Sequence, residues 1–435
     1  MSRGSFGFPV APQRAKALGE IHARPSALIE APRIIIHLAF MTDAGSSVDL
    51  AVLSDLSQTR GLAAPQKDAR HHTMPWGKGT LRWERHTEFS TYAWDGPVPP
   101  RFGGEIVGHP FGDGFNPPGS LISGVRLGIR PWTDENEKAI ETFDPASLCY
   151  SIVEDGRAAA ITDFRQDKDG LTRILVLDRG LSPARAGALS QRLIEIETYR
   201  TLAMLGLPLA QSLSPEIRQI EDGLTEITKR MRADARDDSD ELLGEITKLA
   251  AELEASAAAS LYRFGASRAY DGIVQERLAA LNEEPAAGFE TWSAFLQRRL
   301  APAMRTCRSV EERQANLSGK LARATSLLRS WIDVELEKQN SALLQSMNRR
   351  AKLQLRLQQT VEGLSVAAIS YYIVGLVTYL AKALSDLGLP LDPALVTGLS
   401  VPVVILGIWW LVRRVQRRHA EEDRRNGGGS TELEM

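Results

Sequence analysis

The sequence has few of the features that mark secreted or nucleic-acid-binding proteins. Its 435 residues include only 2 cysteines, Cys149 and Cys307, so a domain held together by several disulfides is excluded. The 52 basic and 54 acidic side chains leave a formal net charge of −2. Without a positive excess to hold a phosphate backbone, we expect no nucleic-acid partner. The first residues contain no apolar run of signal-peptide length, so we expect the N-terminus to stay in the cytoplasm.

Common catalytic motifs are also missing. The sequence contains no GxSxG, HExxH or CxxC, which are signatures of acyl-transfer, zinc-dependent and thiol chemistry. WGKGT at residues 76–80 differs from a phosphate loop, because Gly79 separates the lysine from the threonine. We therefore expect a protein that is not an enzyme and has no cofactor beyond a possible divalent cation.

Residues 1–182 are predicted to form a cytoplasmic α+β domain. Short apolar runs alternate there with Gly, Pro and Asp, a pattern typical of strands mixed with a few helices. The expected strands cover residues 33–40, 81–86, 88–94, 121–129, 147–154, 158–164 and 172–178, and the expected helices cover 48–62 and 136–142. Residues 96–119 are so rich in Gly and Pro that a long loop or a lid is expected there.

Residues 183–360 are predicted to form an all-α stalk of long helices. The expected breaks lie at residues 206–208, 234–238 and 284–285 and at Pro302. Apolar residues between Leu327 and Ala351 recur at steps of three and four, which places them on one stripe of a helix. A long helix with such a stripe needs a partner, so a coiled coil and a homo-oligomer are expected.

Residues 361–415 are predicted to form a two-helix transmembrane hairpin. Residues 363–381 and 393–412 contain no charged side chain, and each run has the length that crosses a hydrocarbon core. Basic residues flank the hairpin on its two outer sides: Arg349, Arg350, Lys352 and Arg356 before it, and Arg413, Arg414, Arg417 and Arg418 after it. The positive-inside rule then predicts a multi-pass protein of the bacterial inner membrane with both termini cytoplasmic, including a flexible tail at residues 416–435.

One face of the first predicted membrane helix carries small and hydroxyl-bearing residues. Ser365, Ala368, Tyr372, Gly375 and Tyr379 follow each other at steps of three and four. Such a stripe marks close helix packing, or it lines an axial pore when several subunits meet. The short connection outside the membrane carries Asp386 and Asp392, which could attract cations to a pore mouth.

An acidic cluster lies at the predicted break in the stalk. It contains Asp234, Asp237, Asp238 and Glu241, whose carboxylates could bind a hard divalent cation. A structural interpretation competes, because Asp238 followed three residues later by Glu241 is a capping box at a helix start.

Two blocks of the sequence resemble a known family. Residues 12–40, with the string Glu-Ile-His-Ala-Arg-Pro at 20–25, and residues 335–384, with QQTVEGLSV at 358–366, are similar to a bacterial family of membrane-anchored proteins known only as a domain of unknown function. The resemblance covers nearly the whole chain. It implies a location and an architecture and assigns no activity.

The predicted architecture also resembles that of CorA-type magnesium channels. This similarity implies an oligomeric funnel whose first membrane helix continues the stalk, and divalent cations bound by cytoplasmic carboxylates. The Gly-Met-Asn signature of that family is absent, and Val377-Thr378-Tyr379-Leu380 stands in its place. Two functions are therefore carried forward, a CorA-like cation transport protein and a membrane-tethered scaffold or sensor whose hairpin is only an anchor.

Overall fold

The computed structural model describes residues 11, 13–14, 27–42, 46–67, 69–234, 239–386 and 392–426, without the side chains of Ser46, Asp234, Asp386 and residues 415–426. The chain divides into two compact units, Met1–Leu328 and Arg329–Met435. These are called the first and the second unit below. The predicted domain boundaries at residues 182 and 360 stay a prediction; within the first unit, the stalk helices before Leu328 share one core with the sheet.

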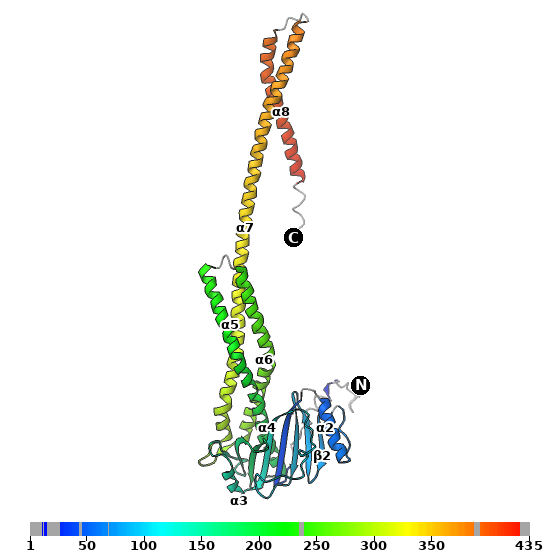
Figure 1. Cartoon of the computed structure of the whole chain (residues 1–435), viewed down its shortest axis with the longest axis vertical. Helices are drawn as coiled ribbons and strands as arrows, with labels where there is room; N and C mark the ends of the chain where they lie inside the picture. Colours follow the sequence, from blue (N-terminus) through cyan, green and yellow to red (C-terminus); the bar gives the residue numbers. More distant parts are fainter. Residues whose placement is uncertain are drawn as a thin grey trace. The chain divides into compact units, whose positions relative to one another are not determined.

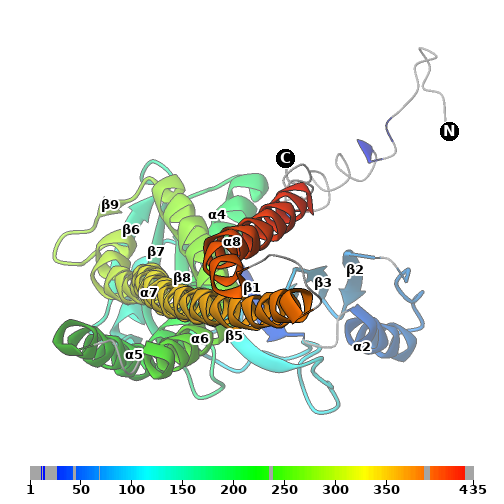
Figure 2. The same cartoon turned by 90° about the horizontal axis from the view of Figure 1, so that it is seen from above.

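Within the described residues, nine strands form one sheet in the first unit (Figure 1). The strands are β1 (Arg33–Met41), β2 (His71–Trp76), β3 (Gly79–Arg85), β4 (Phe89–Gly96), β5 (Ser120–Pro131), β6 (Cys149–Val153), β7 (Ala158–Gln166), β8 (Thr172–Asp178) and β9 (Glu284–Pro285). Their order is β2-β3-β4-β1-β5-β8-β7-β6-β9. Figure 2 shows β6 and β9 at its left and β2 at its right. The β5–β8 pair is parallel and the other named pairs are antiparallel.

All seven predicted strands are present, so the α+β prediction for the N-terminal region is confirmed. The structure adds β2 and β9, which sequence patterns did not reveal. Strand β2 lies at the edge of the sheet and contains Pro75, which an edge strand tolerates because its outer side needs no ladder donor. The helices expected at 48–62 and 136–142 are found as α2 (Ser46–Thr59) and as α3 (Asp134–Glu137) with the 3₁₀ turn η1 (Lys138–Thr142).

Both faces of the sheet are covered near β1. Ile34, Ile36, Leu38 and Phe40 pack in a cluster with α2 and with the loop between β4 and β5. Ile35 lies on the opposite face, in the cluster that also contains the helical core. Burial on both faces explains why the sequence of β1 is apolar almost throughout instead of alternating.

The Gly- and Pro-rich loop between β4 and β5 packs against the sheet. Ile106 is buried, and Phe111 and Phe115 pack in the same cluster as Trp94. The guanidinium of Arg130 on β5 donates hydrogen bonds to the carbonyl oxygens of Pro99 and Pro100. The residues between β4 and β5 therefore form the expected long loop, held down by aromatic rings and one arginine.

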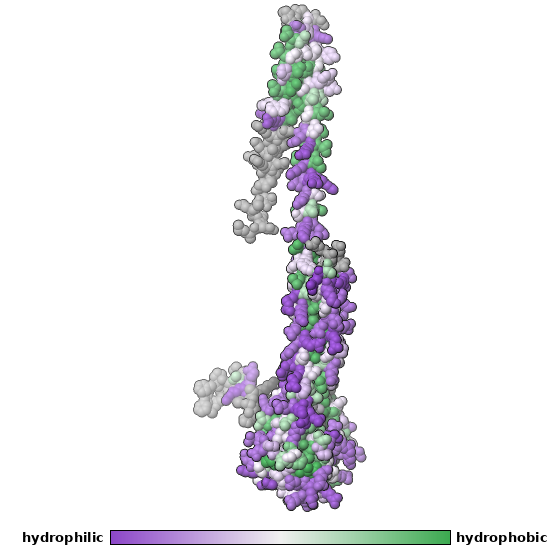
Figure 3. Space-filling view, turned by 90° about the vertical axis from the view of Figure 1, so that its left-hand side faces the viewer, coloured by the Kyte–Doolittle hydropathy of each residue, from purple (hydrophilic) through white to green (hydrophobic). Residues whose placement is uncertain are grey.

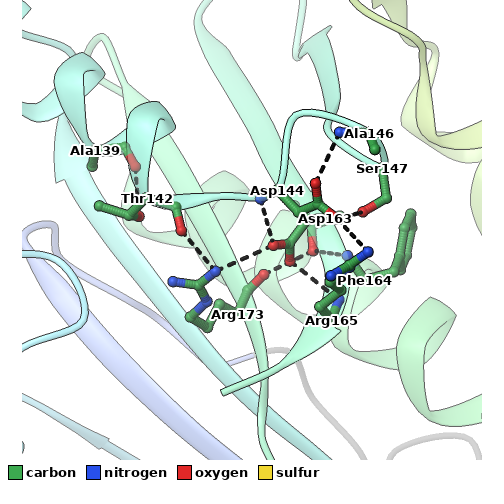
Figure 4. Close-up of polar contacts among 10 residues, drawn as sticks. Ala139, Thr142, Asp144, Ala146, Ser147, Asp163, Phe164, Arg165 and Arg173 are labelled. Carbon is green, nitrogen blue, oxygen red and sulfur yellow. Dashed lines mark hydrogen bonds and ion pairs between the residues drawn. The ribbon is translucent and has the colours of Figure 1, made fainter. Parts of the chain in front are cut away.

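A carboxylate on β7 holds the chain segment that leads into β6 (Figure 4). Asp163 accepts hydrogen bonds from the backbone N–H groups of Asp144 (3.0 Å) and Arg165 (3.1 Å) and pairs with Arg173 at 3.2 Å. Arg165 pairs in turn with Asp144. Phe164 has a φ of 54°, where the β7–β8 register shifts. The ion pair between the buried Asp163 and the partly buried Arg173 therefore fixes a local bulge and does not form an open site.

The helices that follow the sheet are α4 (Pro183–Met204), α5 (Gly206–Asp234), α6 (Ser239–Leu281), α7 (Trp292–Asp386) and α8 (Pro393–Asn426). The break expected at residues 206–208 is present, since α4 ends at Met204 and α5 begins at Gly206. The break expected at 284–285 is present as β9. Helices α5 and α6 and the first part of α7 run side by side in the first unit (Figure 1) and bury a continuous apolar core.

The predicted break at Pro302 is wrong. Pro302 lies inside α7, which begins at Trp292. The Glu283 carboxylate accepts hydrogen bonds from the backbone N–H groups of Trp292 (3.1 Å) and Ser293 (2.7 Å). The Trp292 ring is fully buried, and its indole N–H donates to the carbonyl oxygen of Ala160 at 3.1 Å. These contacts fix the helix start, and the surrounding core offsets the hydrogen bond lost at the proline.

The second unit contains the remainder of α7 and all of α8. Figure 3 shows hydrophobic side chains, in green, over the last stretch of α7 and over the part of α8 whose side chains are described. The expected helical region and apolar C-terminal helices are therefore confirmed.

Candidate functional site

Two of the described helices are long and apolar enough to cross a membrane, α7 in its final part and α8 from Pro393 to Arg414. Their apolar side chains are largely uncovered, as Leu376 (62% exposed) and Leu399 (67% exposed) illustrate. A core helix of a water-soluble protein would bury such side chains. Length, composition and exposure together fit two membrane spans.

Helix α8 contacts one face of α7. Ser370 and Ala381 on α7 are buried, and the hydroxyl oxygens of Thr378 and Thr397 lie 3.1 Å apart, which is hydrogen-bond distance. A cleft between the helices is lined by Gly363, Val366, Ala367, Ser370, Tyr371 and Val374 of α7 and by Val401 and Ile405 of α8. Small and hydroxyl-bearing residues thus form the contact, as is usual between membrane helices.

The predicted small-residue stripe of α7 faces away from α8. Successive residues turn by about 100°, so Tyr372 lies about 200° round the helix from Ser370. Tyr372 and Tyr379 are 72% and 75% exposed. Ser365 and Ala368 are also exposed and Gly375 is half-buried. The stripe is therefore not the surface that packs α7 onto α8 within one chain.

Charged groups lie at the ends of the apolar segments. The guanidinium groups of Arg413 and Arg414 lie 4.7 Å and 5.0 Å from the ring centroids of Trp409 and Trp410, an arrangement typical of a membrane interface. Asp392 accepts a hydrogen bond from the backbone N–H of Ala394 at 3.0 Å, so it caps α8. The side chain of Asp386 lies outside the described residues.

The acidic cluster lies mostly outside the described residues. Asp237 and Asp238 are not described, and Asp234 is described only as the last residue of α5. Glu241 lies 3.8 Å from Arg230, which pairs more closely with Glu245 at 2.8 Å. In the described part of the chain, no three His, Cys, Asp or Glu side chains are grouped to hold a metal ion. The cation site stays a prediction, and so does the capping box.

A cavity in the first unit was not found from the sequence. It has a volume of about 130 Å³ and lies between α4 and the face of β1, β3 and β4 that carries Ile35 and Ala93. Its lining comes from the loop before β1 (Ala27, Ile29), from the strands (Ile35, His37, Arg82, Glu84, His86, Phe89, Thr91, Ala93) and from α4 (Gly187, Ser190, Gln191, Ile194, Glu195, Thr198, Tyr199). In the sequence, the one local feature that could have pointed to this cavity is His37, the polar residue inside the apolar run of β1.

Two buried polar atoms of this lining have no hydrogen-bond partner among the residues that the structure describes. They are Nδ1 of His37 and Oγ1 of Thr198, on side chains that are 9% and 3% exposed. The neighbouring Thr201 on α4 donates to the carbonyl oxygen of Glu197 at 3.0 Å, whereas Thr198 makes no such bond. Burial lowers the pKa of His37 from its ordinary value of 6.5 to about 4, so its imidazole is neutral at physiological pH.

Most charged groups of the cavity are paired. Arg82 lies 3.0 Å from Asp95. Glu195 pairs with Arg277 and accepts a hydrogen bond from Gln191 at 2.8 Å. Glu84 lines the same wall as Arg82. The cavity therefore combines apolar side chains, a neutral imidazole and charged groups that are mostly paired.

Comparison with known proteins gives one family. A family model described as "Protein of unknown function (DUF3422)" matches residues 9–419. No curated protein matches the chain. The match confirms the resemblance seen in the two sequence blocks, and it assigns no activity to the hairpin or to the cavity.

Proposed function

The chain belongs to the DUF3422 family of proteins of unknown function, and from this premise we propose that it is a homo-oligomeric membrane protein that passes cations in a CorA-like manner. The observation that supports this proposal is the position of α8 on α7. Because α8 covers the Ser370 face, the stripe with Tyr372 and Tyr379 is left for neighbouring copies and a central passage. Hydroxyl groups on such a stripe suit the lining of a pore.

Exposed apolar side chains support the homo-oligomer. Leu343, Leu344 and Met347 on α7 are all more than half exposed and precede the predicted membrane span. Exposing them to water costs about 25 cal/mol per Å² of apolar surface. The same helix from other copies would cover them, in the predicted coiled coil. We propose the lipid bilayer and further copies of this chain as partners, and no nucleic acid.

The proposed orientation places both termini in the cytoplasm of a bacterial cell and the α7–α8 connection outside its inner membrane. The basic residues Arg349 and Arg356 before the hairpin and Arg413 and Arg414 after it support this orientation. The sequence motifs of the common enzyme classes are absent, so we propose no catalytic role.

Cysteine labelling tests the orientation. Asp392→Cys in spheroplasts is expected to react with a membrane-impermeant maleimide, whereas Arg418→Cys is expected to react only after lysis. The native Cys149 and Cys307 are buried, and burial raises the pKa of Cys149 to about 12 and that of Cys307 above its ordinary value, so the background is low. Labelling of Arg418→Cys in intact spheroplasts would contradict the orientation.

Flux measurements test the passage. The oligomer reconstituted into liposomes is expected to admit Co²⁺, and Gly375→Leu is expected to lower the rate by about tenfold because a large side chain narrows the passage. Val403→Leu, at an exposed position of α8, serves as the matched control and should leave the rate unchanged. Oligomer size is measured for each variant. Wild-type liposomes that admit no more Co²⁺ than empty ones would exclude transport.

The second candidate function is a membrane-tethered, non-enzymatic scaffold or sensor. The cavity between α4 and the sheet favours it, because two buried polar atoms there have no partner within the described residues. In a scaffold or sensor of this kind, the hairpin serves only as a membrane anchor. A purified chain that is monomeric and passes no Co²⁺ would favour this candidate over the first.

A further inference from the structure

We propose that the cavity between α4 and strands β1, β3 and β4 binds a neutral heteroaromatic molecule of one or two rings that carries a hydrogen-bond donor and an acceptor. This site is independent of cation transport, and it would be the ligand-binding site of a sensor. The proposal rests on the shape of the cavity, on its two unpartnered polar atoms and on the charged side chains around it.

The walls of the cavity combine apolar and polar side chains and are closely fitted. Ile35, Phe89 and Ile194 contribute side chains from the sheet and from α4. A Cβ atom added to Gly187 would lie 1.7 Å from the carbonyl oxygen of Ala27, so the loop before β1 approaches α4 as closely as glycine allows. The space of about 130 Å³ is close to that of a cavity known to hold a benzene ring, about 150 Å³.

The two unpartnered atoms lie on opposite walls. His37 belongs to β1 and Thr198 to α4, and both side chains line the cavity. A buried polar atom without a partner destabilises the protein. A flat ligand between the sheet and the helix, with one donor and one acceptor, satisfies both atoms at once. Each neutral partner accepts either role, because an imidazole and a hydroxyl can donate or accept.

The charges around the cavity disfavour an anion. Arg82 pairs with Asp95 at 3.0 Å, and Asp95 also pairs with Arg33 at 2.9 Å. Glu84 and Glu195 contribute two carboxylates to the lining, and Glu195 is paired with Arg277. A phosphate or carboxylate ligand would therefore meet no unpaired cation among the described lining residues. A neutral ring meets no such penalty.

Calorimetry with the full-length protein in detergent tests the proposal. Benzimidazole, which has one donor and one acceptor, is the probe, and indene, which has the same ring size and neither group, is its comparison. We expect benzimidazole to bind with a Kd below about 1 mM and at least tenfold more tightly than indene. Micelles without protein provide the blank.

Three variants locate the site. Thr198→Val keeps the shape and removes the hydroxyl, so we expect benzimidazole affinity to fall about tenfold, whereas Thr198→Ser should retain it. Ala93→Leu fills the cavity and should abolish binding. Thr225→Val on the exposed face of α5 is the matched control and should bind like the native protein. Thermal unfolding without probe confirms that each variant is folded.

Three results would each overturn the proposal: no heat above the blank, equal affinity for benzimidazole and indene, or unchanged binding by a folded Ala93→Leu variant. Because the titration is done in detergent without an ion gradient, these results are independent of the Co²⁺ flux. Failure of the site is thus distinguished from failure of transport.

Discussion

Replacing Asp49 with alanine is expected to lower the free energy of unfolding of the first unit by about 4 kcal/mol. Asp49 is fully buried in the first turn of α2. One of its oxygens, Oδ1, accepts hydrogen bonds from the hydroxyls of Ser90 (2.6 Å) and Tyr92 (2.8 Å) and from the indole N–H of Trp83 (3.3 Å). Alanine would leave three buried donors of the sheet without their acceptor.

Amide hydrogen exchange in α2 and β4 of the full-length protein measures this loss, because Asp49 joins these two elements. Asp49→Asn keeps an oxygen at the same place, so its free energy of unfolding is expected to fall by about half as much as that of Asp49→Ala. Asp55→Ala, at an exposed position of the same helix, is the matched control and should change the free energy by less than about 0.5 kcal/mol. An Asp49→Ala protein with native exchange rates would show that the three donors find other partners.

Local patterns were sufficient to predict most of the sheet and the two apolar C-terminal helices. The apolar run of β1 and the Gly and Pro residues between runs fix where strands begin and end, since they act within a few residues of the chain. The uncharged runs before Lys382 and Arg413 mark the two membrane candidates in the same way. These features depend on composition along the chain and need no distant partner.

Contacts between distant segments could not be predicted. Glu88 accepts hydrogen bonds from Arg263 (2.6 Å) and Tyr270 (2.7 Å) on α6, and nothing near Glu88 in the sequence indicates these partners. The start of α7 depends on Glu283 and on the buried Trp292, so the proline rule alone placed a break too late. Propensity is a weak guide where tertiary packing decides.

The cavity illustrates the same limit for a candidate site. Its lining is drawn from segments between Ala27 and Tyr199, and only the sheet order brings β3 and β4 next to β1. His37, a polar side chain in an apolar strand, is the residue of the lining whose position in the sequence stands out, but the sequence analysis made no prediction from it. Its role depends on α4, whose position the sequence does not give.

Acidification is expected to destabilise the first unit through His37 by about 3 kcal/mol in total. Burial lowers the pKa of this imidazole from 6.5 to about 4. Between these two pH values the unfolded chain binds a proton at His37 and the folded chain does not, so stability falls as the pH falls. The contribution is complete above pH 6.5 and levels off below about pH 4.

Other charged groups and a second imidazole face the same cavity, so the wild-type profile alone does not isolate His37. Glu84 on β3 and Glu195 on α4 face the same space, together with Arg82 and His86. The comparison is therefore between the native protein and His37→Asn, which removes the titrating ring and keeps a small polar side chain. Contributions from the carboxylates cancel in the difference between the two profiles.

Urea unfolding followed by tryptophan fluorescence at a series of pH values measures both profiles, because Trp83, Trp94 and Trp292 are buried in the first unit. We expect the His37→Asn profile to be flatter between pH 6.5 and 4, and the His71→Asn profile, changed at an exposed position of β2, to follow the native one. Parallel profiles for the native protein and His37→Asn would mean that His37 binds its proton at the same pH in the folded and unfolded states. In that case the cavity would hold a charged imidazole under acid conditions, and a neutral ring would no longer be its best ligand.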